Sequence, residues 1–149
     1  MQLSELKTVA TLVREMIENV VSESTYVGIE LQRFPSGACE VSSVILGLYL
    51  KEKYDVNVVQ SVGKRPSPDC EYGENNHVWL TVNATVVVDI TADQFDDFSS
   101  KVFVGCDSAF HDTFEVYDTR PVDFSYLLRR GSEGYGRVYK EVATRMASV

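Results

Sequence analysis

Apolar residues recur at three- and four-residue steps over residues 3–21, and this spacing predicts an amphipathic helix. Charged side chains, Arg14 among them, fill its other face. A second helix is predicted over residues 39–54, and apolar residues surround almost the whole of its first part. Small residues such as Gly47 provide the only interruptions, so we expect a buried central helix with another segment packed closely against it.

The rest of the chain alternates β-rich runs with turn residues. A loop without apolar periodicity is predicted over residues 63–76. Strands are predicted over residues 56–62, 78–82, 85–89, 101–105 and 113–117. A short helix over 123–130, a glycine joint at Gly131, Gly134 and Gly136, and a final helix over 138–146 follow. Helices followed by antiparallel strands predict an α+β fold, with the central helix packed on an antiparallel sheet.

Length, charge and cysteine count narrow the classes of protein that fit. The 149 residues are the length of one domain, so we expect a single domain over 1–149. A net charge of −8 argues against binding to nucleic acid phosphates or to anionic membranes. No apolar run is long enough to span a membrane, and the N-terminal residues lack the features of a secretory signal. We therefore expect a cytoplasmic protein, although export by a dedicated secretion machine would leave the same pattern.

Three residue types at particular positions point to nucleophilic chemistry. Cys39 opens the central helix, where unpaired N–H groups and the helix dipole stabilise a thiolate. His77 stands where a polar loop enters a strand, and histidine is the usual base for a thiol. Asp89 closes an apolar strand, and a carboxylate there needs a partner such as a histidine ring. The alternative roles are a small buried cysteine, an ordinary strand-end histidine and a turn-capping aspartate.

The hairpin between the last two of these residues offers a geometric test. A two-residue turn at Asn83-Ala84 would place His77 and Asp89 on opposite faces of the sheet. A three-residue loop over 82–84 would instead place them directly opposite each other. A Cys-His-Asp triad therefore predicts an odd loop or a bulge, and Asn83 tolerates the left-handed conformation that such loops need.

The motifs Gly37-Ala38-Cys39-Glu40, His77-Val78-Trp79-Leu80 and Val88-Asp89-Ile90-Thr91 occur in this order along the chain. Together they resemble the Cys, His, Asp series of transglutaminase-like, papain-type cysteine enzymes, a superfamily with many small bacterial members. The resemblance covers about residues 32–95. It implies a papain-like core with the cysteine at the start of the central helix and the other two residues on adjacent strands.

The resemblance also implies roles for individual residues. Cys39 would be the nucleophile, His77 the base and Asp89 the acid that orients the histidine. Gln32 would be a candidate side-chain donor to the oxyanion, beside the backbone N–H of Cys39. Trp79 shares the strand face of His77, and it would wall the substrate site or pack in the core. No cofactor and no metal are implied.

The expected reaction is hydrolysis or transfer at an amide bond of a peptide, isopeptide or glutamine type, through an acyl-enzyme. The substrate would be a protein or peptide, or else a small acyl or amide compound. Three other functions remain open: an inactive protein-binding module on the same fold, a secreted toxin or effector with deamidase or protease activity, and a small structural or immunity-type protein whose acidic surface binds a basic partner. The sequence is silent on oligomeric state.

Other residues of the chain show weaker patterns. A zinc site from Cys39, Cys70, His77 and Cys106 is conceivable but has no signature spacing. His111 is expected on the surface or in a loop, and it would replace His77 as the base only if His77 were buried. The acidic run of Asp93, Asp96 and Asp97 is expected to be a solvated face, or a rim that favours cationic substrates.

Overall fold

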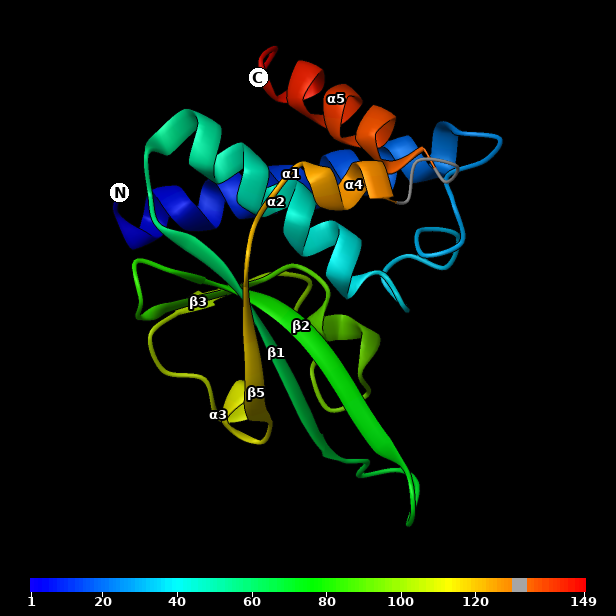
Figure 1. Ribbon diagram of the computed structural model, residues 1–149, viewed down its shortest axis with the longest axis vertical. Helices are drawn as coiled ribbons and strands as arrows, with labels where there is room; N and C mark the ends of the chain where they lie inside the picture. The colour runs from blue at the N-terminus through cyan, green and yellow to red at the C-terminus, as the bar shows by residue number, and fades with distance from the viewer. Residues whose placement is uncertain (130–133) are drawn as a thin grey trace.

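The computed structural model describes residues 1–129 and 134–149. Two long helices come first, α1 (Leu3–Glu23) and α2 (Cys39–Tyr54). The apolar face of α1 is buried, as its spacing predicts. Every residue of α2 from Val41 to Leu50 is buried, which confirms the predicted central helix. Figure 1 shows α1 and α2 gathered with α4 (Ser125–Arg129) and α5 (Tyr135–Met146), while the strands extend away from them.

The strands of the described residues form one sheet in the order β4-β3-β2-β1-β5, and each neighbouring pair is antiparallel. The helix α2 packs against β2 and β1. The structure is therefore α+β with an antiparallel sheet, as predicted. The strands are β1 (Val58–Pro66), β2 (Glu74–Val82), β3 (Val86–Asp89), β4 (Phe103–Gly105) and β5 (Glu115–Pro121).

The prediction of a loop over residues 63–76 is wrong at both ends. β1 continues to Pro66 and β2 begins at Glu74, and these two residues pair with each other. The connecting loop is only residues 67–73. The strands were missed because the residues at the end of this hairpin are polar and show no apolar alternation. A polar residue can nevertheless be buried there, and Arg65 is only 6% exposed.

The second half of the chain contains short elements: the 3-10 helix η1 (Ala92–Gln94), and the helices α3 (Ala109–Asp112), α4 (Ser125–Arg129) and α5 (Tyr135–Met146). The strands predicted over 101–105 and 113–117 are found as β4 and β5, with shifted bounds. The helix predicted over 123–130 is found as α4, and residue 130 lies outside the described part, as does Gly131 of the predicted joint. Gly134 precedes α5 with a φ of 76°, and Gly136 lies within that helix.

The small residue Gly47 marks the close contact expected on α2. A Cβ atom built at this position would lie 2.9 Å from a methyl group of Val122. The Nζ atom of Lys51, one helical turn further on, donates to the carbonyl of Val122 at 2.8 Å. In Figure 1 the segment that leaves β5 runs across α2 on its way to α4. The contact fixes the segment to the buried helix, as the small residues predict.

The two faces of the sheet pack against different partners. One face, with Leu80 and Val88, joins the large apolar cluster formed with the helices. The other face carries Trp79, which packs with Phe110 and Phe114 in a smaller cluster. Side chains of β2 therefore alternate between the helical core and an aromatic cluster. None of the helices in the described residues is long and apolar enough to cross a membrane.

Candidate active site

The hairpin between β2 and β3 decides whether His77 and Asp89 can meet. Val82 pairs with Val86, so the loop contains the three residues 83–85. Asn83 and Ala84 both have positive φ, at 50° and 67°. The predicted odd loop and the left-handed Asn83 are confirmed. The predicted register is wrong by two residues, and continuing the pairing beyond Leu80 and Val88 brings Trp79, not His77, opposite Asp89. A register shift of two residues keeps the side chains of His77, Trp79 and Asp89 on the same face of the sheet. His77 therefore contacts Asp89 diagonally.

The structure brings His77 and Asp89 into direct contact. The Nε2 atom of His77 lies 2.6 Å from Oδ2 of Asp89. Both side chains are enclosed, with exposed fractions of 0% for the histidine and 2% for the aspartate. The other carboxylate oxygen accepts the backbone N–H of Thr91 at 2.9 Å. A buried carboxylate with such partners stays ionised and fixes the orientation of the imidazole ring.

The charges of this pair reinforce each other. Burial alone would lower the pKa of His77, but the charge and hydrogen bond of Asp89, together with interactions with Cys39, raise it to about 9. Burial alone would raise the pKa of Asp89, but the two histidines that contact it hold the pKa well below its usual range. The thiol of Cys39 is among the groups that raise the pKa of His77, so it lies near the ring. Cys39, His77 and Asp89 are therefore gathered at one place.

The tautomer of His77 follows from its contacts. Because Nε2 faces the carboxylate, Nδ1 is the nitrogen left for the thiol. Cys39 is the first residue of α2, and its side chain is only partly buried. The nucleophile candidate is thus open to solvent on one side, while its base is enclosed. A substrate can reach this thiol without exposing the buried pair of His77 and Asp89 to water.

Gln94 is a neighbour that the sequence analysis missed. Its Nε2 atom lies 3.5 Å from Nδ1 of His77 and donates to the carbonyl of Thr91 at 3.0 Å. Its Oε1 atom accepts the backbone N–H of Gly37 at 3.4 Å. The amide therefore joins η1 to the turn that precedes Cys39. The residue was missed because it follows the aspartate rather than preceding the cysteine.

Gln32 is the side chain that the sequence suggested as the oxyanion donor. Its side chain is exposed in the turn that follows α1. None of the hydrogen bonds between described residues joins it to Cys39, His77 or Asp89. The geometry thus favours Gln94 over Gln32 as the amide beside the thiol.

The expectation that His111 lies on the surface or in a loop is wrong. It is in α3 and is 4% exposed. Its Nε2 atom lies 2.6 Å from Oδ2 of Asp89, the same oxygen that His77 contacts. Its Nδ1 atom lies 2.5 Å from Oγ of Ser108. Although His77 is buried, His111 does not replace it as the base, because both nitrogens of His111 already have partners.

Aromatic rings enclose the two histidines. The ring centre of Trp79 lies 5.6 Å from that of His77 and 4.9 Å from that of His111. At 3% exposed, Trp79 has the core-packing role and does not line an open site. Phe95 and Phe114 lie 5.0 and 5.8 Å from His77. This apolar enclosure keeps water from the charged pair and strengthens the interaction between them.

The acidic run after the triad is only partly a solvated face. Asp93 pairs with Arg14 through two bonds of 2.7 and 2.9 Å, and Arg14 is 3% exposed. Asp97 pairs with Arg65 through two bonds of 2.8 Å. Two of the three carboxylates thus hold the segment around η1 in place. Arg14, predicted on the polar face of the first helix, instead points inward and also donates to the carbonyl of Ile90 at 2.7 Å.

Of the four residues of the zinc site considered from the sequence, only His77 belongs to the group whose ligand atoms lie close together. Cys70 and Cys106 are exposed. Within the part of the chain that the structure describes, the group with ligand atoms close together is His77, Asp89 and His111, all within 4.8 Å. Ligand atoms around a tetrahedral zinc ion stand roughly 3.3 Å apart, whereas each imidazole here lies 2.6 Å from the carboxylate oxygen. Those are hydrogen-bond distances, so we describe the group as a hydrogen-bonded cluster.

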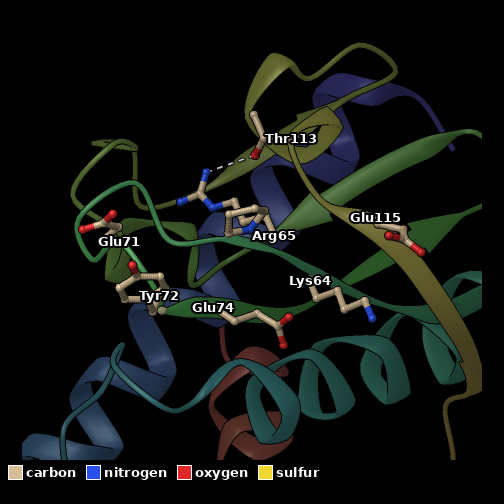
Figure 2. Close-up of a pocket in the computed structure, with 9 residues that line it drawn as sticks. Lys64, Arg65, Glu71, Tyr72, Glu74, Thr113 and Glu115 are labelled. Carbon is tan, nitrogen blue, oxygen red and sulfur yellow. Dashed lines mark hydrogen bonds between the residues drawn. The ribbon is translucent and has the colours of Figure 1, made fainter.

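The cavity at the end of the β1–β2 hairpin is separate from this cluster. It has a volume of about 390 Å³, and its lining includes Arg65, Tyr72 and Glu74 but none of Cys39, His77 and Asp89. Figure 2 shows Arg65 reaching Thr113, with Tyr72 and Glu71 on the hairpin loop. The cluster itself is closed apart from the side of Cys39. A substrate would therefore approach along the start of α2 and not through this cavity.

Comparison with known proteins adds no relative. Searches of protein-family models, curated proteins and solved structures return no match to this chain. The fold and site define the chain as an α+β protein with a clustered cysteine, histidine and aspartate. Any function has to be argued from that geometry.

Proposed function

We propose that this protein is a cysteine-nucleophile enzyme that acts on an amide or related acyl bond of a protein or peptide. The contact between His77 and Asp89 at 2.6 Å, with Cys39 raising the pKa of the same ring, is the observation that carries the proposal. A buried carboxylate that orients a histidine, and a thiol near the other nitrogen of that histidine, form the arrangement that activates a nucleophile.

In the proposed reaction Cys39 is the nucleophile, His77 moves protons and Asp89 orients the histidine. The thiol of Cys39 gives its proton to Nδ1 of His77. Its Sγ atom attacks the carbonyl carbon, and the carbonyl electron pair moves to the oxygen. Collapse of this intermediate breaks the C–N bond, and the amine leaves with a proton from Nδ1 of His77. Water then attacks the thioester while His77 takes its proton, and the acid product departs as the S–C bond breaks. An amine in place of water gives transfer, so hydrolysis is the simplest form because it requires no second substrate site.

Two groups are candidates for stabilising the oxyanion of the intermediate. The backbone N–H of Cys39 belongs to the first turn of α2 and has no acceptor within the helix. The Nε2 atom of Gln94 lies beside Nδ1 of His77, the position at which the thiol reacts. When His77 gains a proton on Nδ1, it no longer accepts from this amide, and the N–H of Gln94 is free to donate to the oxyanion.

Selective alkylation tests the proposal without a known substrate. Iodoacetamide at limiting concentration and pH 7 is expected to modify Cys39 at least tenfold faster than the exposed Cys70 and Cys106, which are internal references measured by peptide mass spectrometry. His77→Gln is expected to remove this advantage and leave the two reference cysteines unchanged. Equal modification of all three cysteines in the wild-type protein would refute the enzyme.

A further inference from the structure

A second cavity lies beside the first turn of α2, the helix that begins with Cys39. It has a volume of about 380 Å³, and its lining includes Gln60, Arg120, Pro121, Asp123, Ser125 and Tyr126. Three of these side chains donate hydrogen bonds to Glu40, the residue that follows Cys39: Gln60 to its backbone carbonyl, and Arg120 and Tyr126 to its carboxylate. The cavity is therefore next to the proposed nucleophile, and the proposed reaction gives it no role.

The side-chain amide of Gln60 has a fixed orientation at this cavity. The residue is 2% exposed, and its Nε2 atom donates to the carbonyl of Glu40 at 3.2 Å and to Oγ of Ser43 at 2.7 Å. A backbone carbonyl can only accept, and the hydroxyl of Ser43 donates its own proton to the same carbonyl at 3.0 Å. The nitrogen of the amide must therefore face α2, which places Oε1 on the side away from these partners.

The oxygen of this amide has no hydrogen-bond donor among the described residues. The printed partners of Gln60 are all acceptors for its nitrogen. Unlike the hydroxyl of Ser42, which is fully enclosed without a partner, Oε1 of Gln60 is not sealed within the protein. Because Gln60 lines the cavity, this oxygen offers an acceptor to a ligand N–H. Pairing a buried polar atom that lacks a partner is energetically favourable.

Arg120 supplies a donor next to this acceptor. Gln60 and Arg120 are directly opposite each other on β1 and β5, so their side chains lie side by side on one face of the sheet. The guanidinium donates through Nη1 to Glu40 and through Nε to Asp118. Its Nη2 atom donates to none of the residues that the structure describes. A ligand in the cavity can therefore meet an acceptor and a donor together.

The charges around the cavity disfavour a charged ligand. Arg120 is paired with two carboxylates, Glu40 and Asp118, and Asp123 lines the same cavity. An anion would meet these carboxylates and the oxygen of Gln60, whereas a cation would meet the guanidinium. A carboxamide is neutral and has both an N–H and a C=O group, so it can donate to Gln60 while it accepts from Arg120.

We propose that this cavity is a recognition subsite that binds a carboxamide side chain, that of glutamine or asparagine, next to the bond that Cys39 attacks. The carboxamide is a recognition group and not the bond that reacts. Its use by a substrate rests on the proposed function, whereas the binding of a carboxamide rests on the cavity alone. The two parts are separable by experiment.

Acetyl-dipeptide vinyl sulfones, which alkylate cysteine, test the subsite through the rate at which Cys39 is modified. One series varies the residue that carries the vinyl sulfone and a second series varies the residue before it, in each case among glutamine, glutamate, lysine and norleucine. Each rate is divided by the rate of the same protein with iodoacetamide, so that a change in the thiol itself cancels. In the wild-type protein, the glutamine probe is expected to react at least tenfold faster than the other three in one of the series.

Arg120→Met tests the donor, and it is preferred to a change at the buried Gln60 because the side chain of Arg120 is 41% exposed. The variant is expected to reduce the preference for glutamine to within about threefold. Arg145→Met is the matched control, since Arg145 is also paired with two carboxylates, Glu23 and Glu141, and does not line the cavity. It is expected to retain the wild-type preference.

The outcomes separate the subsite from the enzyme. A wild-type protein with no preference, or one that prefers glutamate, lysine or norleucine, overturns the proposal, and so does an equal loss in both arginine variants. If Cys39 is no more reactive than Cys70 toward iodoacetamide, the enzyme is refuted and NMR decides the subsite. The side-chain amide signals of Gln60 are then expected to shift with acetyl-glutamine amide and not with acetyl-glutamate amide. Equal responses to the two compounds would overturn the subsite as well.

Discussion

The imidazole of His77 and the carboxylate of Asp89 are in contact at 2.6 Å inside an enclosure that excludes water. They lie on neighbouring strands and contact each other diagonally, because Trp79 is the residue directly opposite Asp89 when the pairing is continued. An ionic hydrogen bond in such a setting depends on both partners keeping their charges. The stability of the fold is therefore linked to pH through this pair.

Raising the pH above neutral is expected to destabilise the protein. The folded chain holds the proton of His77 more tightly, with a pKa of about 9, than an unfolded chain does at about 6.5. The stabilisation is thus fully present below pH 6.5 and is lost as the pH rises through about 9. A difference of this size is worth at most on the order of 3 kcal/mol. Urea unfolding at pH 6.5, 7.5 and 9 measures the slope.

Asp89→Asn is the control for that slope. The substitution keeps the shape of the side chain and removes the charge that raises the pKa of His77. Its free energy of unfolding is expected to be lower than that of the wild type at pH 6.5, and to change little between pH 6.5 and 9. A wild-type protein whose stability is flat over the same range would contradict the assignment.

The variants Gln94→Ala and Gln32→Ala together test which amide side chain donates to the oxyanion. Gln94→Ala is expected to slow acylation by p-nitrophenyl acetate by about 100- to 1000-fold, the effect of losing one oxyanion donor. Gln32→Ala, at an exposed position, is expected to stay within twofold of the wild-type rate. Stopped-flow release of p-nitrophenol measures the acylation step. Equal rates in the two variants would remove Gln94 from the proposed mechanism.

Gly63 is expected to tolerate no side chain. A Cβ atom there would lie 2.8 Å from the indole of Trp79 and 3.0 Å from Cβ of Phe114. Gly63→Ala is expected to lower the free energy of unfolding by about 1–3 kcal/mol, because the indole cannot move away within its aromatic cluster. The control is Gly136→Ala within α5, where the nearest atom is 3.6 Å away and alanine is expected to raise helix stability. Chemical denaturation of both variants gives the comparison.

Arg14→Met is expected to cost about 3–5 kcal/mol, since it leaves Asp93 without its partner in a largely enclosed position. Lys101→Ala removes an exposed ion pair with Glu18 and is expected to cost less than about 1 kcal/mol. Thermal unfolding distinguishes the two. A small effect at Arg14 would mean that the segment before Gln94 is held by its backbone contacts alone.

The sequence predicted the elements that depend on apolar spacing. The bounds of α2 and the start of α1 match, because burial of a helix face leaves a regular pattern. Cys39, His77 and Asp89 were found by residue type and by position relative to element ends. Their meeting depends on an odd hairpin loop, which the residue Asn83 supports but does not fix to one register.

Buried polar residues could not be predicted in the same way. Arg14, Arg65 and His111 are each enclosed because a particular partner, far away in the chain, satisfies their hydrogen bonds. Spacing along one element carries no information about such partners, so a charged residue is assigned to the solvent by default. The phenylalanines near His111 in the sequence could have indicated that this histidine is buried. They were given no weight because charged residues lie between them.

Both outer strands of the sheet are poorly suited to receive another strand. β4 has only three residues, and the pairing of β5 with β1 is interrupted by a register shift at Val62 and Gly63. β5 also bears several charges and ends in Pro121. Such edges resist aggregation through strand addition. If the proposed function holds, a peptide substrate would be bound through its side chains and by loops around Cys39, and a few contacts close to the cleaved bond would set the selectivity.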